Sequence, residues 1–201
     1  MKFILGRKLN MTQIFDKEGV VHPATIVEAA PVVVSQIKTV DNDGYSAVQV
    51  ASGVKKAERI NKPMKGHLKD LGAFAALREF RVDEITNKVG DKIDLSQFQP
   101  GDAIEVSAIS KGKGFQGVVK RHGFGGGPRT HGQKHSEREP GSIGGGLRNK
   151  VPKAMRMAGR MGGDRITVKN LKVLHIDQAT NTVYISGAIP GRKGTLVEII
   201  G

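Results

Sequence analysis

The chain contains no cysteine and no tryptophan, and its aromatic residues are limited to seven phenylalanines and two tyrosines. The absence of cysteine excludes disulfide bonds and thiolate metal ligands, and it is compatible with a reducing compartment. The shortage of aromatic rings argues against a surface on which successive bases of single-stranded nucleic acid stack. Apolar runs are short, and near the start Phe3–Leu5 is followed at once by Gly6, Arg7 and Lys8. We therefore expect no signal peptide and no membrane span, but a soluble cytoplasmic protein.

Acidic side chains are scarce in one stretch. From Lys111 to Arg160 there are twelve Lys or Arg residues and only two acids, Glu137 and Glu139, a net charge of +10 out of +13 for the whole chain. The same stretch holds thirteen of the twenty-seven glycines and few large apolar residues. It cannot bury enough apolar surface to offset the entropy lost on ordering. We therefore expect a polyanionic partner to order it, and nucleic acid is the commonest such partner.

A membrane surface is the rival polyanion. It would call for a basic amphipathic helix, but here the basic residues are scattered among glycines. The sequence thus favours nucleic acid and predicts no membrane contact.

Outside this stretch, short runs rich in Val, Ile and Thr alternate with turn signals and predict an antiparallel barrel or sandwich. A short helix is predicted over Pro63–Leu71, with Gly72 as its C-cap. The predicted fold is mainly β with small α/β excursions: a body of residues 1–109 and 161–201, and a long basic glycine-rich loop, 110–160, inserted between strands. The expected strands cover residues 3–5, 11–15, 24–27, 32–40, 45–50, 77–82, 102–109, 166–168, 172–176, 182–186 and 196–200.

Gly112–Gly117 fits the G-x-G-x-x-G pattern of dinucleotide-binding folds. The helix that could follow ends at Gly123, which is too short for a βαβ crossover. We expect instead that the glycines let backbone N–H groups approach phosphates closely. His131 and His135 have a metal-like spacing, but no helical pattern brings their rings to one face, and no serine lies in a nucleophile elbow. We expect no cofactor, no metal, no small-molecule substrate and no catalytic residue.

Taken together, these residues resemble the bacterial type of the large-subunit ribosomal protein three family over nearly the whole chain. The most specific segment is Ser110–Phe124. The further matching segments, in chain order, are Gly6–Phe15, Asn61–Pro63, Gly66-His67, Arg78–Arg81, His131-Gly132, Pro140–Gly144, Met157–Gly162, Ile166–Leu171 and Gly187–Gly191.

The resemblance implies a structural, non-enzymatic component of the large ribosomal subunit with a barrel like that of translation-factor second domains. Family members bind large-subunit (23S-type) rRNA early in assembly, contact neighbouring ribosomal proteins and extend toward the peptidyl-transferase region. Phosphate contacts set register without reading bases, so we expect recognition of RNA shape. The expected rRNA-binding residues are Lys111, Lys113, Lys120, Arg121, His122, Arg129, His131, Lys134, His135, Arg138, Arg148, Lys150, Lys153, Arg156 and Arg160.

Three departures from the family pattern carry expectations of their own. Asn10 stands where the family usually has glycine, and because Asn tolerates positive φ, we expect a turn to survive there. Val151–Arg156 is less basic than the corresponding family run, which thins the local positive charge. Residues 145–147 lack the glutamine that some members methylate, so that modification is expected to be absent.

Two rival functions follow from the residues themselves. A nucleotide-dependent enzyme would use Gly112–Gly117 and would bind NAD or ATP saturably. A nonspecific nucleoid or mRNA-binding protein would bind duplex DNA as tightly as rRNA fragments.

Overall fold

The computed structural model describes residues 1–146 and 150–201, apart from the side chain of Asp70. The chain forms two compact units. We call residues 1–109 with 165–201 the body, and residues 110–164 the extension.

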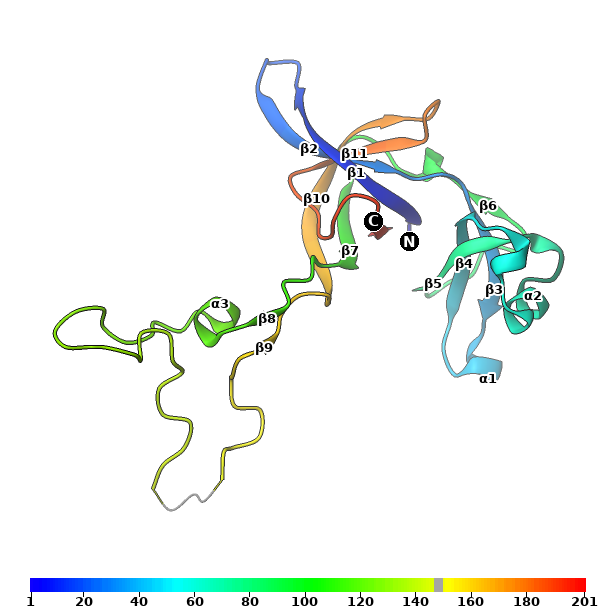
Figure 1. Ribbon diagram of the computed structural model, residues 1–201. Helices are drawn as coiled ribbons and strands as arrows, with labels where there is room; N and C mark the ends of the chain where they lie inside the picture. The colour runs from blue at the N-terminus through cyan, green and yellow to red at the C-terminus, as the bar shows by residue number, and fades with distance from the viewer. Residues whose placement is uncertain (147–149) are drawn as a thin grey trace. The chain divides into compact units, whose positions relative to one another are not determined.

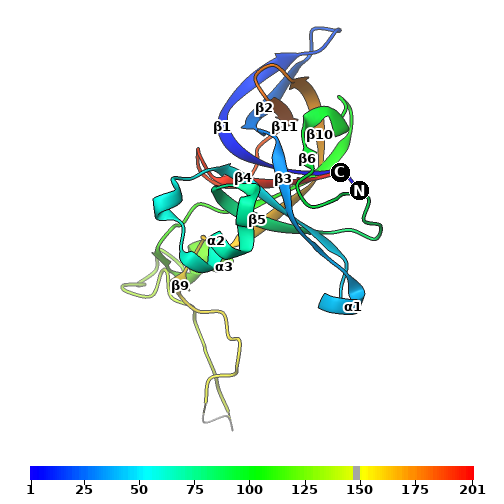
Figure 2. The ribbon, with the colours of Figure 1, turned by 90° about the vertical axis from the view of Figure 1, so that its right-hand side faces the viewer.

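Six antiparallel strands of the body close into a barrel (Figure 1). Figure 2 shows β1, β2, β11 and β10 in succession around its wall. The closed barrel confirms the mainly β prediction and decides between barrel and sandwich. In their order around the barrel, the strands are β1 (Phe3–Phe15), β12 (Leu196–Ile200), β7 (Ala103–Ile109), β10 (Arg165–Asp177), β11 (Thr182–Ser186) and β2 (Val21–Glu28).

A second sheet of the body has the strand order β5-β4-β3-β6. The sequence did not distinguish these strands from those of the barrel. β3, β4 and β5 form a meander, and β6 pairs with the other edge of β3. Alternation in the sequence does not specify which partner a strand pairs with. Their bounds are β3 (Val32–Lys38), β4 (Ala47–Val54), β5 (Phe74–Arg81) and β6 (Lys92–Ile93).

The core lies inside the barrel and against the second sheet. Alternate residues of β11 and β12 are buried, as a strand with one covered face requires, and in β7 Ser107 is buried in addition to the alternate residues Ile104, Val106 and Ala108. In β1, by contrast, Phe3–Gly6 are all buried. The Phe3 ring stacks on Phe80 of β5 with centroids 4.7 Å apart, so the start of β1 is covered on both faces and joins the two sheets.

Several local expectations change. The strand expected over residues 32–40 ends at Lys38, and Val40 begins the short helix α1 (Val40–Asp43) at the expected turn. Gly44 ends this helix in the left-handed conformation at φ 79°. The predicted helix is present as α2 (Lys62–Leu68), and a 3-10 turn leads to Gly72. Further 3-10 turns cover Ala57–Arg59 and Leu95–Gln97.

The barrel strands β1 and β10 are longer than expected. β1 also covers the residues between the expected strands 3–5 and 11–15, and β10 those between 166–168 and 172–176. In β1 the register shifts between Lys8 and Met11, and Asn10 lies in this irregular segment without a positive φ. The expected turn at Asn10 is therefore wrong, because a β-bulge takes up the irregularity. In β10 the register shifts between Val168 and Leu171, where Asn170 has φ 58°.

The extension contains little regular structure among its described residues. Two short strands, β8 (Phe115–Gln116) and β9 (Gly159–Arg160), pair antiparallel, and α3 (Val118–His122) follows β8. The rest of the extension consists of loops (Figure 1).

Candidate nucleic-acid interface

The two chain segments at the base of the extension run side by side and are joined by backbone hydrogen bonds. Ser110 donates from its N–H to the Asp164 carbonyl at 2.8 Å, Lys113 to Met161 at 2.9 Å, and Met161 to Gly114 at 2.9 Å. The β8–β9 pair continues this ladder. We call these paired segments, 110–116 and 159–164, the stem.

Close packing in the stem requires glycine at one position in particular. Gly162 has φ +75°, and a Cβ there would lie 2.2 Å from the Lys111 carbonyl oxygen. A real side chain cannot approach a backbone atom that closely, so only glycine lets the two segments meet here.

Helix α3 has one apolar anchor and two polar ones. Val118 is buried, with 2 % of its surface exposed. Arg121 donates from Nη1 to the Met157 carbonyl at 2.7 Å, and the His122 Nε2–H donates to the same oxygen at 3.0 Å. The helix ends at Gly123, which is left-handed at φ 72°. Two side chains of one turn thus hold α3 against the segment that returns toward the stem.

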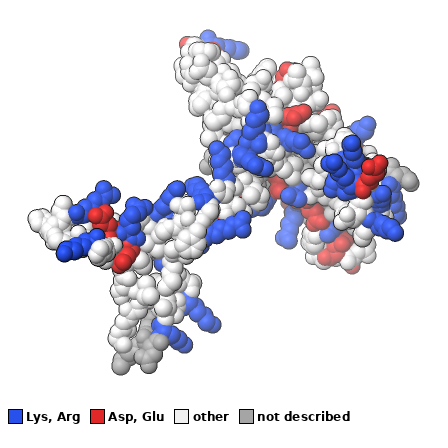
Figure 3. Space-filling model, viewed as in Figure 1, with Lys and Arg blue, Asp and Glu red and all other residues white. Residues whose placement is uncertain are grey.

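The remaining cationic side chains of the extension are exposed and unneutralised. Ten of its eleven described Lys and Arg residues are exposed, and no ion pair within 4 Å involves any of the eleven among the described residues. Figure 3 shows these side chains distributed along the extension. A like-charged surface of this kind repels itself and attracts a polyanion.

Five of the twenty Lys and Arg residues of the body, in contrast, form ion pairs within the described part of the chain. Lys2 pairs with Asp102 at 2.6 Å, Lys38 with Glu79 at 3.1 Å, and Lys169 with Glu105 at 3.2 Å. Arg78 and Arg165 both donate to Glu198, whose side chain is only 12 % exposed. The positive charge of the extension, by contrast, is not neutralised by acidic side chains among the described residues.

The structure places the predicted rRNA-binding residues in three groups. Arg121 and His122 are half-buried and hold α3 in place, a role that sequence reasoning missed because no spacing indicates a contact 35 or 36 residues away. Arg148 lies outside the described residues. The exposed positions are Lys111, Lys113 and Arg160 in the stem, Lys120 on α3, and Arg129, His131, Lys134, His135, Arg138, Lys150, Lys153 and Arg156 in the loops.

One of the exposed cations contacts an aromatic ring. The guanidinium carbon of Arg156 lies 5.0 Å from the centroid of the Phe124 ring. This cation–π contact leaves the guanidinium edge available for further hydrogen bonds.

Comparison with known proteins gives a consistent result. The family model described as "Ribosomal protein L3" matches residues 55–189. "Large ribosomal subunit protein uL3" of Herpetosiphon aurantiacus is 49 % identical over 199 residues, 98 % of this chain and 94 % of the relative. The protein of the same name from Dehalococcoides mccartyi is 48 % identical over 198 residues, 98 % of this chain and 96 % of the relative. The chain belongs to the ribosomal protein L3 family.

Membership of the L3 family confirms the resemblance read from the sequence. It also confirms a non-enzymatic role and a place in the ribosome, since the family consists of structural ribosomal proteins. Within the described part of the chain, no helix is long and apolar enough to cross a membrane.

Proposed function

We propose that this protein is a structural constituent of the large ribosomal subunit that binds large-subunit rRNA through its extension. The single observation that carries the proposal is the set of exposed Lys and Arg side chains on the extension, none of which has an acidic partner among the described residues. Phosphate groups supply the missing negative charge, and release of their counterions drives the binding.

The shape of the extension supports RNA as the polyanion. Its exposed loops carry many glycines, so the backbone itself can follow an irregular surface closely. Folded RNA presents such surfaces, with phosphates and 2′-hydroxyls more accessible than its major-groove base edges. The extension therefore neutralises and fills space between RNA helices, and its cations set position and register.

The proposal extends to the setting of the binding. By its likeness to the uL3 relatives, which are named as large-subunit proteins, the chain assembles with 23S-type rRNA and neighbouring ribosomal proteins in the cytoplasm. Its binding belongs to early subunit assembly and supports the architecture near the peptidyl-transferase centre. Sedimentation of the tagged protein with large subunits after a high-salt wash tests this association.

A binding experiment tests the role of the extension directly. If about half of its twelve basic groups meet phosphates, log K for rRNA fragments falls against log salt with a slope of roughly −4 to −5. The variant K134A/R138A/K150A/K153A removes four charges from the extension, and K17A/K55A/K56A/K62A removes four exposed charges from the body. On the same assumption the first variant removes about two phosphate contacts, so we expect it to flatten the slope by about 1.5, and we expect the second to leave the slope nearly unchanged. Equal effects of the two variants, or a slope near zero for the wild type, contradict the proposal.

A further inference from the structure

Phe115 of β8 is the most exposed aromatic side chain in the described part of the chain, with 77 % of its surface exposed. It lies in the stem (Figure 1), where its Cα pairs with that of Arg160 in β9. The backbone beside it is held in place, because the Met161 N–H donates to the Gly114 carbonyl at 2.9 Å. Single exposed apolar side chains are common on proteins. The surroundings of this ring therefore decide whether it has a partner.

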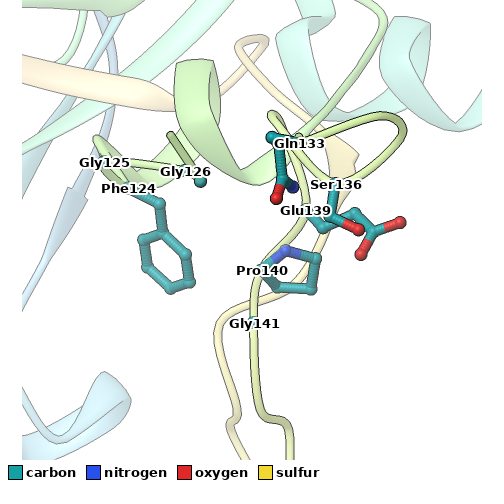
Figure 4. Close-up of a pocket in the computed structure, with 9 residues that line it drawn as sticks. Phe124, Gly125, Gly126, Gln133, Ser136, Glu139, Pro140 and Gly141 are labelled. Atoms are coloured by element: carbon teal, nitrogen blue, oxygen red, sulfur yellow. The ribbon is translucent and has the colours of Figure 1, made fainter. Parts of the chain in front are cut away.

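The other phenylalanine of the extension, Phe124, is used within the chain. It is half-buried and lines a pocket in the loop of residues 124–141 (Figure 4). The Arg156 guanidinium carbon lies 5.0 Å from the centroid of its ring, and the centroid of the His122 ring lies 6.0 Å away. Among the described residues, no ring and no cation makes such a contact with Phe115. A flat partner can therefore approach Phe115 without displacing an aromatic or cation–π contact of the chain.

Glycines next to Phe115 leave the space around it open. A Cβ at Gly112, Gly114 or Gly117 would meet nothing within 4 Å. Gly114 has φ +67°, which favours glycine, but Gly117 has φ −70° and ψ 166°, which residues with side chains adopt readily. Because Gly117 follows Phe115 by two residues in extended backbone, a side chain there would lie on the same face as the ring. The missing side chain keeps this face accessible to a planar group of a partner.

The partner of this ring must also satisfy exposed positive charges. Directly paired residues of two antiparallel strands project to the same face, so the Arg160 side chain lies beside Phe115. Arg160, Lys111 and Lys113 are exposed, and within the described part of the chain no ion pair involves them. An apolar protein surface that covered the ring would strip these cations of water without compensation. Nucleic acid places a flat base and a phosphate close together, so it supplies both a stacking surface and negative charge.

We propose that Phe115 stacks on one unpaired base of the RNA, while Arg160 binds a phosphate of the same strand. The proposal rests on the proposed function, because it takes RNA as the ligand of the extension. Every base has a flat π face, so stacking adds affinity without selecting the sequence. Unpaired nucleotides in loops and bulges are the ones whose bases stack on aromatic side chains. One ring holds one base, in keeping with the shortage of aromatic residues in the chain.

The test uses the full-length protein and three RNA hairpins that share one stem and differ in one bulged nucleotide, which carries adenine, uracil or no base. The three RNAs have the same charge, so phosphate contacts contribute equally to their binding. At one fixed salt concentration, we expect the adenine hairpin to bind about tenfold more tightly than the abasic hairpin. Uracil has a smaller ring and should give a smaller gain. Equal affinity for all three hairpins would overturn the proposal.

Two leucine variants assign the gain to Phe115. F115L keeps apolar bulk but removes the aromatic face, so the gain from a bulged base should disappear. Because Phe115 is exposed and uncharged, the Tm of the free protein and the salt dependence of RNA binding should stay as in the wild type. F124L makes the same change in the half-buried ring and should retain the gain. Loss of the gain in both variants, or in neither, contradicts the assignment.

The role of Arg160 is tested separately. R160A removes one phosphate contact, so the slope of log K against log salt should flatten by roughly 0.7–0.9. The adenine hairpin should keep its gain over the abasic hairpin, because the ring is intact. An unchanged slope would overturn the phosphate contact of Arg160.

Tryptophan fluorescence detects the stacked base directly. The chain contains no tryptophan, so F115W introduces a single fluorophore at the proposed contact. At saturation, we expect the adenine hairpin to quench its emission more strongly than the abasic hairpin. Equal quenching by the two RNAs would show that no base reaches the ring.

The same measurements separate this proposal from the proposed function. Steep salt dependence without a gain from the bulged base would overturn only the stacking contact. Failure to bind any of the hairpins or rRNA fragments would overturn both.

Discussion

The Arg121 side chain donates from Nη1 to the backbone carbonyl of Met157, 36 residues later in the chain, at 2.7 Å. His122 donates to the same oxygen. The guanidinium also lies over Gly159, where a Cβ would come within 2.6 Å of Nη1. A cation counted from the sequence as a phosphate ligand thus has a structural task inside the extension.

Replacing Arg121 tests this task. R121A removes a charge-assisted hydrogen bond worth about 1 kcal/mol at a half-exposed position, so local opening should become about fivefold more frequent. We expect amide hydrogen exchange to accelerate in α3 and around Met157. K120A, which removes an exposed neighbouring charge, is the control and should leave the exchange unchanged. Equal protection of α3 in R121A and wild type would show that the contact contributes nothing.

The sequence allowed much of the barrel to be predicted, because β11 and β12 bury alternate residues and strands with one covered face carry that pattern. The sequence did not show that β3, β4, β5 and β6 form a sheet separate from the barrel, because the alternation of apolar and polar residues is the same whichever strand is the partner. It also missed that Phe3–Gly6 are buried on both faces, which follows only from the packing of Phe80 against Phe3.

The candidate interface could be predicted only in part for a similar reason. The number of cations can be counted in the sequence, and most of those described are exposed. Which of them are used internally depends on contacts between distant residues, such as Arg121 with Met157. The closed loop between residues 124 and 141 could not be predicted from the sequence. A backbone hydrogen bond between Gly127 and Glu137 closes it, and neither residue type signals such a bond.

Limited proteolysis should follow the distribution of hydrogen bonds in the extension. Among the described residues of 124–156, only two backbone hydrogen bonds are present, Gly127 to Glu137 and Met155 to Pro152, whereas the stem is a continuous ladder. Free in solution, the protein should be cut by trypsin first after the exposed residues Arg129, Lys134, Arg138, Lys150 or Lys153.

Mass spectrometry of early fragments identifies these sites. In purified large subunits, the same bonds should be protected. First cleavage in the body, for example after Lys55 or Lys56, is incompatible with this expectation.

Acid should destabilise the body partly through Asp177. The Thr180 hydroxyl donates to this carboxylate at 2.6 Å, and this bond, together with backbone N–H groups of residues 179 and 180, lowers the pKa of Asp177. Because the folded pKa lies below the unfolded value of about 3.9, the unfolded chain binds the proton more readily. The stabilisation is complete well above pH 4 and is lost as the pH falls through the folded pKa.

Thermal unfolding at pH 7 and at pH 3 measures this contribution. D177N cannot titrate, so its Tm should fall less between the two pH values than that of the wild type. T180A removes the strongest hydrogen bond to the carboxylate, so its Tm should also fall less between pH 7 and pH 3 than that of the wild type. If D177N loses as much Tm in acid as the wild type, the hydrogen bonds of this turn do not contribute to acid sensitivity.

The last prediction concerns Gly144, Gly145 and Gly146, which lie in an exposed part of the extension. A Cβ at Gly144 would lie 3.9 Å from the nearest atom, and one at Gly145 would meet nothing within 4 Å. Gly146 has φ +60°, where a β-branched residue is strained. Since none of the three touches the body's core, changing all three to valine should leave the Tm of the free protein unchanged. The charge is also unchanged, so the salt dependence of RNA binding should persist.

The variant should nevertheless incorporate poorly into large subunits, or yield subunits with impaired peptide synthesis, because the added bulk obstructs close approach of the RNA backbone. The double variant G144V/G145V is the control for strain, since it leaves Gly146 intact. A defect in both variants assigns the effect to bulk against RNA, and a defect in the triple variant alone assigns it to the backbone at Gly146. Normal subunit yield and normal peptide synthesis from the triple variant would mean that this part of the extension acts by charge alone.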